Sequence, residues 1–448
     1  MTGALDRLEA ARSRLPEFAL VVFVIFAAAV AGTVGVRSLK MGALIVATLV
    51  VLLLVSRRPV VLAVVAVGGV YAVQRLGSAS AAPGSSGGVS YSDALLTAAA
   101  IMTLPALAST AELRRLRGAA YAIAVYLALL LPGVAANPSM RAYLEWAHRL
   151  VMLGGALLVG AWLVREGYAR AALRLLTLVS AIVAILAIEW TFTHGFSPAS
   201  PHQWNKNFIG AIFSGVLVLV VAAPHAIELP PVLRWGATIL IAGGLLASQS
   251  RGSELAAATG LLVAFVLNPH AHSVRVRVVA IVGGLALAAG AAISIRHQFN
   301  LNHAALTNSS VGVRYNVEHV TQKIWRTSPI VGVGLKYFFT GHFGPFAYPA
   351  NNVIDNELAE SGVIGLLGFV LFQFGVIAAG IKRRGTPLVA AAVGMICGQL
   401  MHGMVDIFWS AGVSPLPYLI LGMALAATPR PAALSRRSRA RLAVTDGA

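Results

Sequence analysis

The stretch that decides the fold is "WGATILIAGGLLASQSRGSELAAATGLLVAFVL", which runs from Trp235 to Leu267. Two apolar runs, each near the length that crosses a bilayer as a helix, are joined by a short polar segment that contains Arg251 and Glu254. Similar apolar runs of about 16–20 residues recur along the chain. The sequence therefore predicts an all-α, polytopic membrane protein whose helices are joined mostly by short loops.

The composition supports this fold class and excludes others. The chain is 58% hydrophobic and 11% charged, whereas a soluble domain carries about 25% charged residues. A net charge of +18 could suggest a nucleic-acid partner, but arginines set the orientation of membrane proteins, so we expect none. Because Cys397 is the one cysteine, an intrachain disulfide is excluded.

Fourteen spans are predicted, with twelve or thirteen as the alternative because several apolar runs are short. The small residues at Ala29–Gly32 resemble a signal-peptidase site, but the apolar run continues past them, so we expect the first helix to be retained. The predicted spans are residues 17–36, 41–56, 59–75, 94–110, 119–135, 147–164, 171–190, 208–224, 235–249, 253–267, 278–295, 363–381, 387–405 and 412–427.

The Lys and Arg residues orient these spans. With a cytoplasmic N-terminus, most of the 34 Lys and Arg residues fall in inside segments, as the positive-inside rule requires. The chain is then one membrane domain over residues 1–448, with both termini in the cytoplasm. Residues 297–361 form a long extracytoplasmic loop with an amphipathic helix near 310–327, and residues 428–448 form a basic cytoplasmic tail.

A few cations fall on the outer side, against this rule. They include Lys206, Arg251, Arg314 and Lys336. A guanidinium at the membrane boundary is costly unless it is paired. Arg251 therefore either pairs with Glu254, one helical turn away, or binds an anion such as a diphosphate, whose oxygens match the planar fork of arginine donors.

Three acidic residues and one His–Asp pair also lie near predicted helix ends. Asp355, Glu357 and Glu360 precede an apolar span, where carboxylates favour a helix start. His402 and Asp406 share one helix face, as in a polar contact between helices. Metal-ligand motifs such as HExxH or CxxC are missing from the sequence, so we expect no metal site.

The sequence resembles the O-antigen ligase and polymerase family of bacterial membrane glycosyltransferases. The motifs that carry the resemblance occur in the family's order: "WNKNFIG" (Trp204–Gly210), "SRG" (Ser250–Gly252), Arg314, "PIVGVGLKYF" (Pro329–Phe338) and "NNVIDNELAESGVIGL" (Asn351–Leu366). The resemblance covers roughly residues 205–367, and the N-terminal third is similar only in hydropathy.

The resemblance implies an enzyme of the bacterial inner membrane that acts on its outer face in the synthesis of cell-envelope polysaccharide such as lipopolysaccharide. A glycan would pass from a polyprenyl-diphosphate carrier, such as undecaprenyl diphosphate, to a sugar hydroxyl of a glycan or lipid-anchored acceptor, without a metal or cofactor. We expect Arg251, Arg314, Lys206 and Lys336 to bind the donor diphosphate. Residues that could contact or support the acceptor are Asn207, Asn351, Asn352, Glu360, His402 and Asp406.

One position departs from the family pattern. The histidine that the family places before an asparagine is Asn351 here, and asparagine cannot act as a base. Asp355 is therefore the first candidate for the catalytic base, and His342 is the second. Two alternatives stay open: a polymerase of the same family, and a transporter or flippase for lipid-linked glycans that performs no chemistry.

Overall fold

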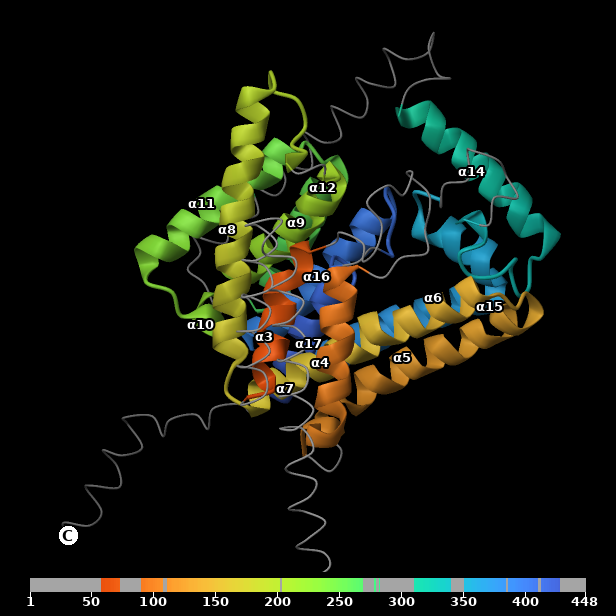
Figure 1. Cartoon of the computed structure of the whole chain (residues 1–448), viewed down its shortest axis with the longest axis horizontal. Coiled ribbons are helices and arrows are strands. Elements are labelled where there is room, and N and C mark those ends of the chain that lie inside the picture. Colours follow the sequence, from red (N-terminus) through yellow and green to blue (C-terminus); the bar gives the residue numbers. More distant parts are fainter. Residues whose placement is uncertain are drawn as a thin grey trace, which may run out of the picture.

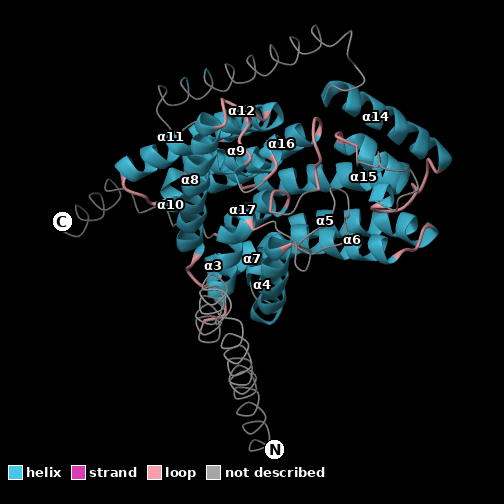
Figure 2. Cartoon of the chain, turned by 45° about the horizontal axis from the view of Figure 1, so that its top comes forward, coloured by secondary structure: helices cyan, strands magenta, loops and turns pink. Residues whose placement is uncertain are grey.

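The computed structural model describes residues 58–72, 90–107, 111–201, 204–268, 310–339, 350–383, 386–409 and 412–427, together with Val278 and Val282. Every regular element in these ranges is a helix or helical turn apart from a single bridge residue (Figure 2). The predicted spans 17–36 and 41–56, most of 278–295, and the tail 428–448 lie outside the described residues.

Each predicted span that falls on described residues contains a helix. The α-helices are α3 (Val60–Gly68), α4 (Tyr91–Leu107), α5 (Ala111–Ala136), α6 (Met140–Leu150), α7 (Ala156–Arg165), α8 (Ala169–Thr193), α9 (Lys206–Ala222), α10 (Pro224–Ile227), α11 (Pro231–Ser248), α12 (Arg251–Leu267), α14 (Ser310–Thr327), α15 (Val353–Ile381), α16 (Pro387–Gly403) and α17 (Pro415–Ala426). A π-helical turn, Val151–Gly155, joins α6 to α7.

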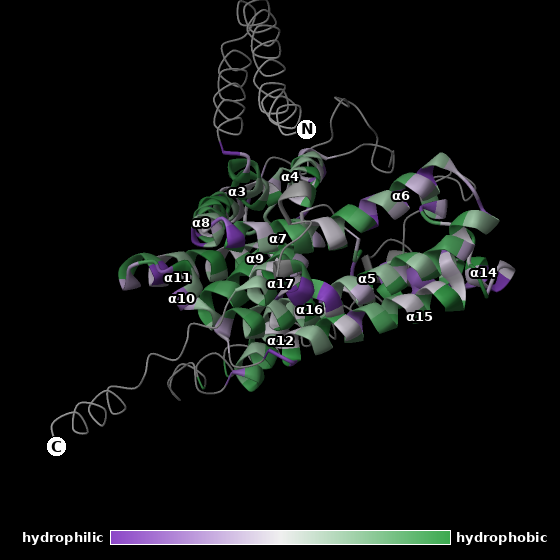
Figure 3. Ribbon diagram, turned by 90° about the horizontal axis from the view of Figure 1, so that it is seen from below, coloured by the Kyte–Doolittle hydropathy of each residue, from purple (hydrophilic) through white to green (hydrophobic). Residues whose placement is uncertain are grey.

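Five of these helical segments are long and apolar enough to cross a membrane: Leu113–Ala136, Met140–Arg165, Ala169–Thr193, Pro231–Ser248 and Val353–Ile381. Apolar residues dominate most of the helices, whereas hydrophilic residues gather at helix ends and on α6 and α14 (Figure 3). The prediction of an all-α, polytopic membrane protein is confirmed.

Small residues let several helices approach closely. A Cβ atom at Gly398 of α16 would overlap the carbonyl of Ala256 in α12, and one at Gly260 would lie 3.0 Å from the Gly394 carbonyl. Small residues on facing helices are the usual means of packing in membranes, where apolar lipid supplies little hydrophobic force between helices. The contact places α12 and α16 side by side, and both reach the functional site described below.

The helices α5, α6 and α15 extend together toward one side of the molecule, with α14 above them (Figure 1). The helix α14 has the bounds predicted for the amphipathic helix. Its buried Ile324 packs with Val333, Phe338 and Ala359 of the protein. This part of its apolar face therefore covers α15 and the preceding loop.

The helix α15 begins ten residues before the predicted span 363–381. The side chain of Asn352 caps it by accepting a hydrogen bond from the Ile354 N–H at 2.9 Å. The polar residues in its first turns lower the mean hydropathy, so hydropathy alone did not predict this start. Asn356, Glu357 and Glu360 nevertheless form hydrogen bonds inside the protein. At Gly362 the backbone is kinked, with φ at 65°, a conformation that glycine adopts without steric cost.

The orientation can be tested by cysteine labelling in a Cys397→Ser background. Gln322→Cys, on the exposed face of α14, should react with a membrane-impermeant maleimide on intact spheroplasts. Glu166→Cys, in the exposed turn after α7, should react only after lysis. We expect these outcomes because most Lys and Arg residues fall in the predicted inside segments. Labelling of Glu166→Cys on intact spheroplasts, with Gln322→Cys protected until lysis, would contradict the predicted orientation.

Candidate functional site

The start of α9 and the end of α16 pack against the turn that joins α11 to α12. The helix α11 ends at Ser248, Gln249 adopts a left-handed conformation with φ of 49°, and α12 begins at Arg251. The hydroxyls of Ser250 and Ser253 lie 2.8 Å apart across the turn. The turn is therefore held by its own serines and contributes the N-terminus of a 17-residue helix.

The start of α9 packs against this turn. The Ser253 hydroxyl donates to the carbonyl of Asn207 at 3.4 Å. A Cβ atom at Gly210 would lie 2.7 Å from the Ser253 hydroxyl and 2.8 Å from the Ser248 hydroxyl. Asn205 caps α9 by accepting a hydrogen bond from the Asn207 N–H at 2.8 Å.

Both helices at this junction begin with a basic residue. Lys206 is the first residue of α9, and Arg251 is the first residue of α12. The N-terminus of a helix carries positive potential and free backbone N–H groups. The junction therefore brings together two helix N-termini, each of which begins with a cationic residue. Arg251 also interacts with the charge of Glu254, the partner predicted from the sequence.

The end of α16 completes the junction. The imidazole of His402 lies against Gly252, because a Cβ atom at position 252 would be 3.2 Å from its Cδ2. The Nε2 atom of His402 is 3.9 Å from Oδ2 of Asp406. These residues therefore lie beside the turn that carries Arg251.

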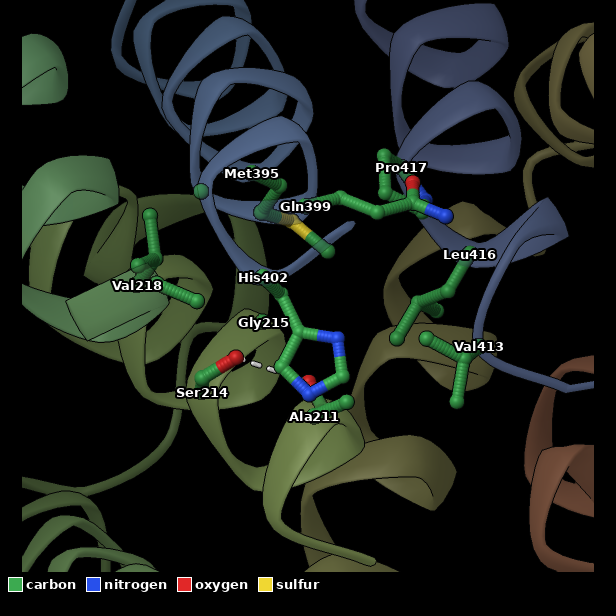
Figure 4. Close-up of a pocket in the computed structure, with 12 residues that line it drawn as sticks. Ala211, Ser214, Gly215, Val218, Met395, Gln399, His402, Val413, Leu416 and Pro417 are labelled. Carbon is green, nitrogen blue, oxygen red and sulfur yellow. Dashed lines mark hydrogen bonds between the residues drawn. The ribbon is translucent and has the colours of Figure 1, made fainter. Parts of the chain in front are cut away.

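A pocket opens beside His402, with about 360 Å³ of empty space when its open side is counted. It lies between α9, α12, α16 and α17, and the side chains of His402 and Gln399 point into it among small and apolar residues (Figure 4). Gln399 is 7% exposed, and neither atom of its amide has a hydrogen-bond partner in the described part of the chain. The pocket therefore combines an apolar lining with a few polar groups.

A second polar cluster surrounds Arg149, whose side chain is fully buried at the end of α6. Its guanidinium donates to Glu145 at 3.2 Å, Glu357 at 2.8 Å and Glu360 at 3.0 Å, and also to the Tyr126 hydroxyl. Such charge-assisted bonds are shorter and stronger than neutral ones. Arg149 therefore ties α6 to α15.

The aromatic residue Trp409 closes this cluster. The guanidinium carbon of Arg149 lies 4.5 Å from the centre of the Trp409 ring, and the Trp409 indole N–H donates to Glu357 at 2.7 Å. Trp409 also stacks on Tyr126. The chain segment from His402 to Trp409 therefore has one end at the pocket and the other end on the Arg149 cluster.

The cluster reaches the surface through two further basic residues. Glu145 lies 3.4 Å from Lys336 and 3.4 Å from His148, and His148 lies 3.1 Å from Asp93. The side chains of Lys336 and His148 are 23% and 29% exposed, whereas the carboxylates are buried. Lys336, predicted as a diphosphate ligand, therefore already has a carboxylate partner.

Glu360 joins the cluster to the preceding loop. Its backbone carbonyl accepts from the Gly334 N–H at 3.0 Å, and its side chain accepts from the Lys336 N–H at 3.0 Å. A Cβ atom at Gly332 would collide with the backbone of Glu360, and one at Gly362 would collide with Ile330. The glycines of the two motifs therefore allow the loop to pack on the kink of α15.

Residues 236–370 match the model of the O-antigen ligase family. The resemblance inferred from the motifs is thereby confirmed, and the match supports a membrane glycosyltransferase of the ligase or polymerase type. The matched segment contains the Arg251 turn, α14, Glu357 and Glu360, whereas Arg149 and His402 lie outside it. No curated protein matches the chain.

The structure corrects two predicted roles. Glu357 and Glu360 were expected at a helix start, but α15 begins at Val353 and both carboxylates lie further along it, buried against Arg149. The reason is that a buried guanidinium needs several acceptors. Glu360 is 2% exposed and engaged on both oxygens, and its role in supporting the acceptor stays a prediction.

The other predicted residues are spread over the site. Asp355 lies in the first turn of α15, half-buried beside Glu318 of α14, and Asn351 and Asn352 precede it. The side chain of Arg314, in the first turns of α14, lies outside the described part of the structure, as does His342. The described residues therefore gather Arg251, Lys206, Asn207, His402 and Asp406 in one place, and Lys336 with Glu360 in another.

The residues of the Arg149 cluster on α6 were not predicted from the sequence. A signal was present: "EWAHR", from Glu145 to Arg149, places titratable residues at positions i, i+3 and i+4 where the predicted span 147–164 begins. Charges inside a span are costly and face the protein interior or a partner. The pattern predicts a buried cluster but does not identify its partners on α15.

Arg149→Met should destabilise the protein strongly, because it leaves three buried carboxylates without their cation. Removing one partner from a buried ion pair typically costs about 3–5 kcal/mol. Thermal unfolding in detergent measures the effect. Arg149→Lys should recover only part of the loss, because lysine lacks the planar fork.

Arg165→Met is the matched control, since Arg165 forms an exposed pair with Glu166 at 3.7 Å. Exposed pairs contribute at most about 1 kcal/mol. If Arg149→Met unfolds at the temperature of the wild type, the cluster does not hold α6 to α15.

Proposed function

We propose that this protein transfers a glycan from a polyprenyl-diphosphate-linked donor to a sugar hydroxyl on the outer face of the bacterial inner membrane. The observation that carries the proposal is the junction of α9 and α12, where Lys206 and Arg251 begin two helices that pack against each other. Two cations and two helix N-termini form an environment suited to a diphosphate.

The chemistry needs such a site. The acceptor oxygen forms a bond with the anomeric carbon while the bond from that carbon to the phosphate oxygen breaks, and the lipid diphosphate leaves with the electron pair. Groups already in place to receive this negative charge lower the barrier. Arg251 and Lys206 supply that role without a metal, and Arg314 is proposed to join them from α14.

The proposal covers both a ligase and a polymerase, which differ in their acceptor. A ligase would use a lipid-anchored core as acceptor, and a polymerase would use a second lipid-linked glycan. A flippase is the alternative of another class, but transporter sites typically lie near the bilayer midplane, whereas Arg251 and Lys206 lie at helix ends. Formation of a new glycosidic linkage with release of polyprenyl diphosphate in detergent separates the enzyme from a flippase.

Arg251→Ala should lower transfer turnover roughly ten- to a hundredfold, since a hydrogen bond to a charged group contributes about 1.5–3 kcal/mol. Arg251→Lys should rescue it only partly, because lysine lacks the fork. The assay uses donor and acceptor fractions extracted from membranes of a strain that lacks this protein.

Arg234→Ala is the control, because Arg234 lies at the opposite end of α11 beside Trp235. It should retain turnover. Unchanged transfer by Arg251→Ala at equal expression would leave the pair with Glu254 as the role of this arginine.

A further inference from the structure

We propose that His402 is the general base that takes the proton from the acceptor hydroxyl, with Asp406 as the residue that orients it. This inference rests on the proposed transfer reaction. The need for a base arises because a sugar hydroxyl must lose its proton as the glycosidic bond forms. The family's histidine is replaced by Asn351, so another residue has to accept that proton.

The first observation is the place of His402. Its Cδ2 edge lies against Gly252, the residue next to Arg251. A displacement at the anomeric carbon needs its base within about one sugar's width of the diphosphate ligand, because the acceptor oxygen and the leaving group lie on opposite sides of the same carbon atom. Asp355, by contrast, lies beside Glu318 at the start of α15.

The second observation is the orientation of the ring. Nε2 of His402 lies 3.9 Å from Oδ2 of Asp406, an ion-pair distance that a bound substrate could shorten into a hydrogen bond. The opposite edge of the ring carries Nδ1, which is directed toward the side of the pocket lined by Gln399 and Leu416 (Figure 4). Asp406 would hold the proton on Nε2, which leaves Nδ1 with the lone pair.

Asp406 is itself fixed for this role. Its Oδ1 accepts a hydrogen bond from the Ile407 N–H at 2.7 Å, which leaves Oδ2 on the side of His402. Further along the same segment, Trp409 is bound to Glu357. The carboxylate therefore sits on a short segment anchored at both ends, as a positioning residue requires.

The third observation is Gln399, one turn before His402 on α16. Both amide atoms are buried in the pocket without a hydrogen-bond partner in the described part of the chain. Leaving a buried polar group unsatisfied costs about 1–3 kcal/mol. A sugar offers neighbouring hydroxyls that accept from the amide NH₂ and donate to the amide oxygen, so Gln399 is proposed to orient the acceptor beside Nδ1 of His402.

The step balances without a further reactant. The acceptor oxygen forms the bond to the anomeric carbon, and its proton moves to Nδ1 of His402. The bond from that carbon to the phosphate oxygen breaks, and the diphosphate leaves with its electron pair near Arg251. The proton then passes from His402 to water or to the departing diphosphate, which restores the neutral imidazole.

The deciding experiment is chemical rescue of His402→Ala in the full-length protein in detergent, with the membrane-extracted donor and acceptor fractions. Losing a general base should lower turnover on the order of a hundred- to ten-thousandfold. Added imidazole should restore part of it, whereas pyrazole, which has the same shape and is hardly basic, should not. Binding of radiolabelled undecaprenyl diphosphate should be retained.

Companion variants keep the proposal falsifiable if His402→Ala folds poorly. Asp406→Asn should lower kcat about ten- to a hundredfold while the KM for the donor stays unchanged, as loss of a positioning residue predicts. Gln399→Leu, of similar size, should raise the KM for the acceptor. The control is His194→Ala, an exposed histidine after α8, which should match the wild type.

The outcomes separate this inference from the proposed function. A wild type that forms no new linkage refutes the function. A wild type that transfers while His402→Ala transfers equally, or stays inactive with imidazole, overturns the base alone. If Asp355→Asn loses turnover and His402→Ala keeps it, the base is Asp355, the residue first suggested by the sequence.

Discussion

The buried guanidinium of Arg149 is the constraint on which the arrangement of α6, α15 and the segment after α16 depends. A charge taken out of water costs several kcal/mol unless partners compensate it. Here Glu145, Glu357 and Glu360 supply carboxylates, and Trp409 covers one face of the guanidinium. Because these partners come from α6, α15 and the segment after α16, their relative positions are coupled through one side chain.

That constraint extends to the motifs that carry the resemblance to the O-antigen ligase family. One oxygen of Glu360 binds Arg149, and the other accepts the Lys336 backbone N–H. The loop from Pro329 to Phe338 and the acidic element of α15 are thus a single packed unit, although they are separate in the sequence. Glycine is required at 332 and 362 because any Cβ would collide with the facing backbone. The family pattern here largely describes packing.

Much of the fold could be predicted from sequence, because apolar run length directly reflects the thickness of the bilayer. The helix 310–327 was predicted from the spacing of its charged and apolar residues. The predicted helix boundaries were wrong where polar residues lie inside a helix. Hydropathy did not include the first ten residues of α15, because Glu357 and Glu360 are polar although they are buried. Averaging over an apolar window likewise concealed Glu145 and Arg149.

The site itself was predictable only in part, since its members come from separate helices. Charge partition predicted an outward position for Arg251, but the start of α9 and His402 are brought to its turn by close contacts at Gly210 and Gly252. Sequence spacing within one helix showed that His402 and Asp406 share a face. It could not show which other helix that face meets.

The environments of the cations predicted to face outward also differ in a way that bears on the proposed transfer. Lys336 lies beside Glu145 and belongs to a cluster with four carboxylates and three basic groups, so its charge is largely compensated. Arg251 and Lys206 instead begin helices whose dipoles add positive potential to their own charges. A departing diphosphate, which gains negative charge in the transition state, is stabilised more by the second environment than by the first. In the proposed transfer, the start of α9 and α12 would therefore be the better place for the leaving group, while the Arg149 cluster holds α15 and the Trp409 segment together.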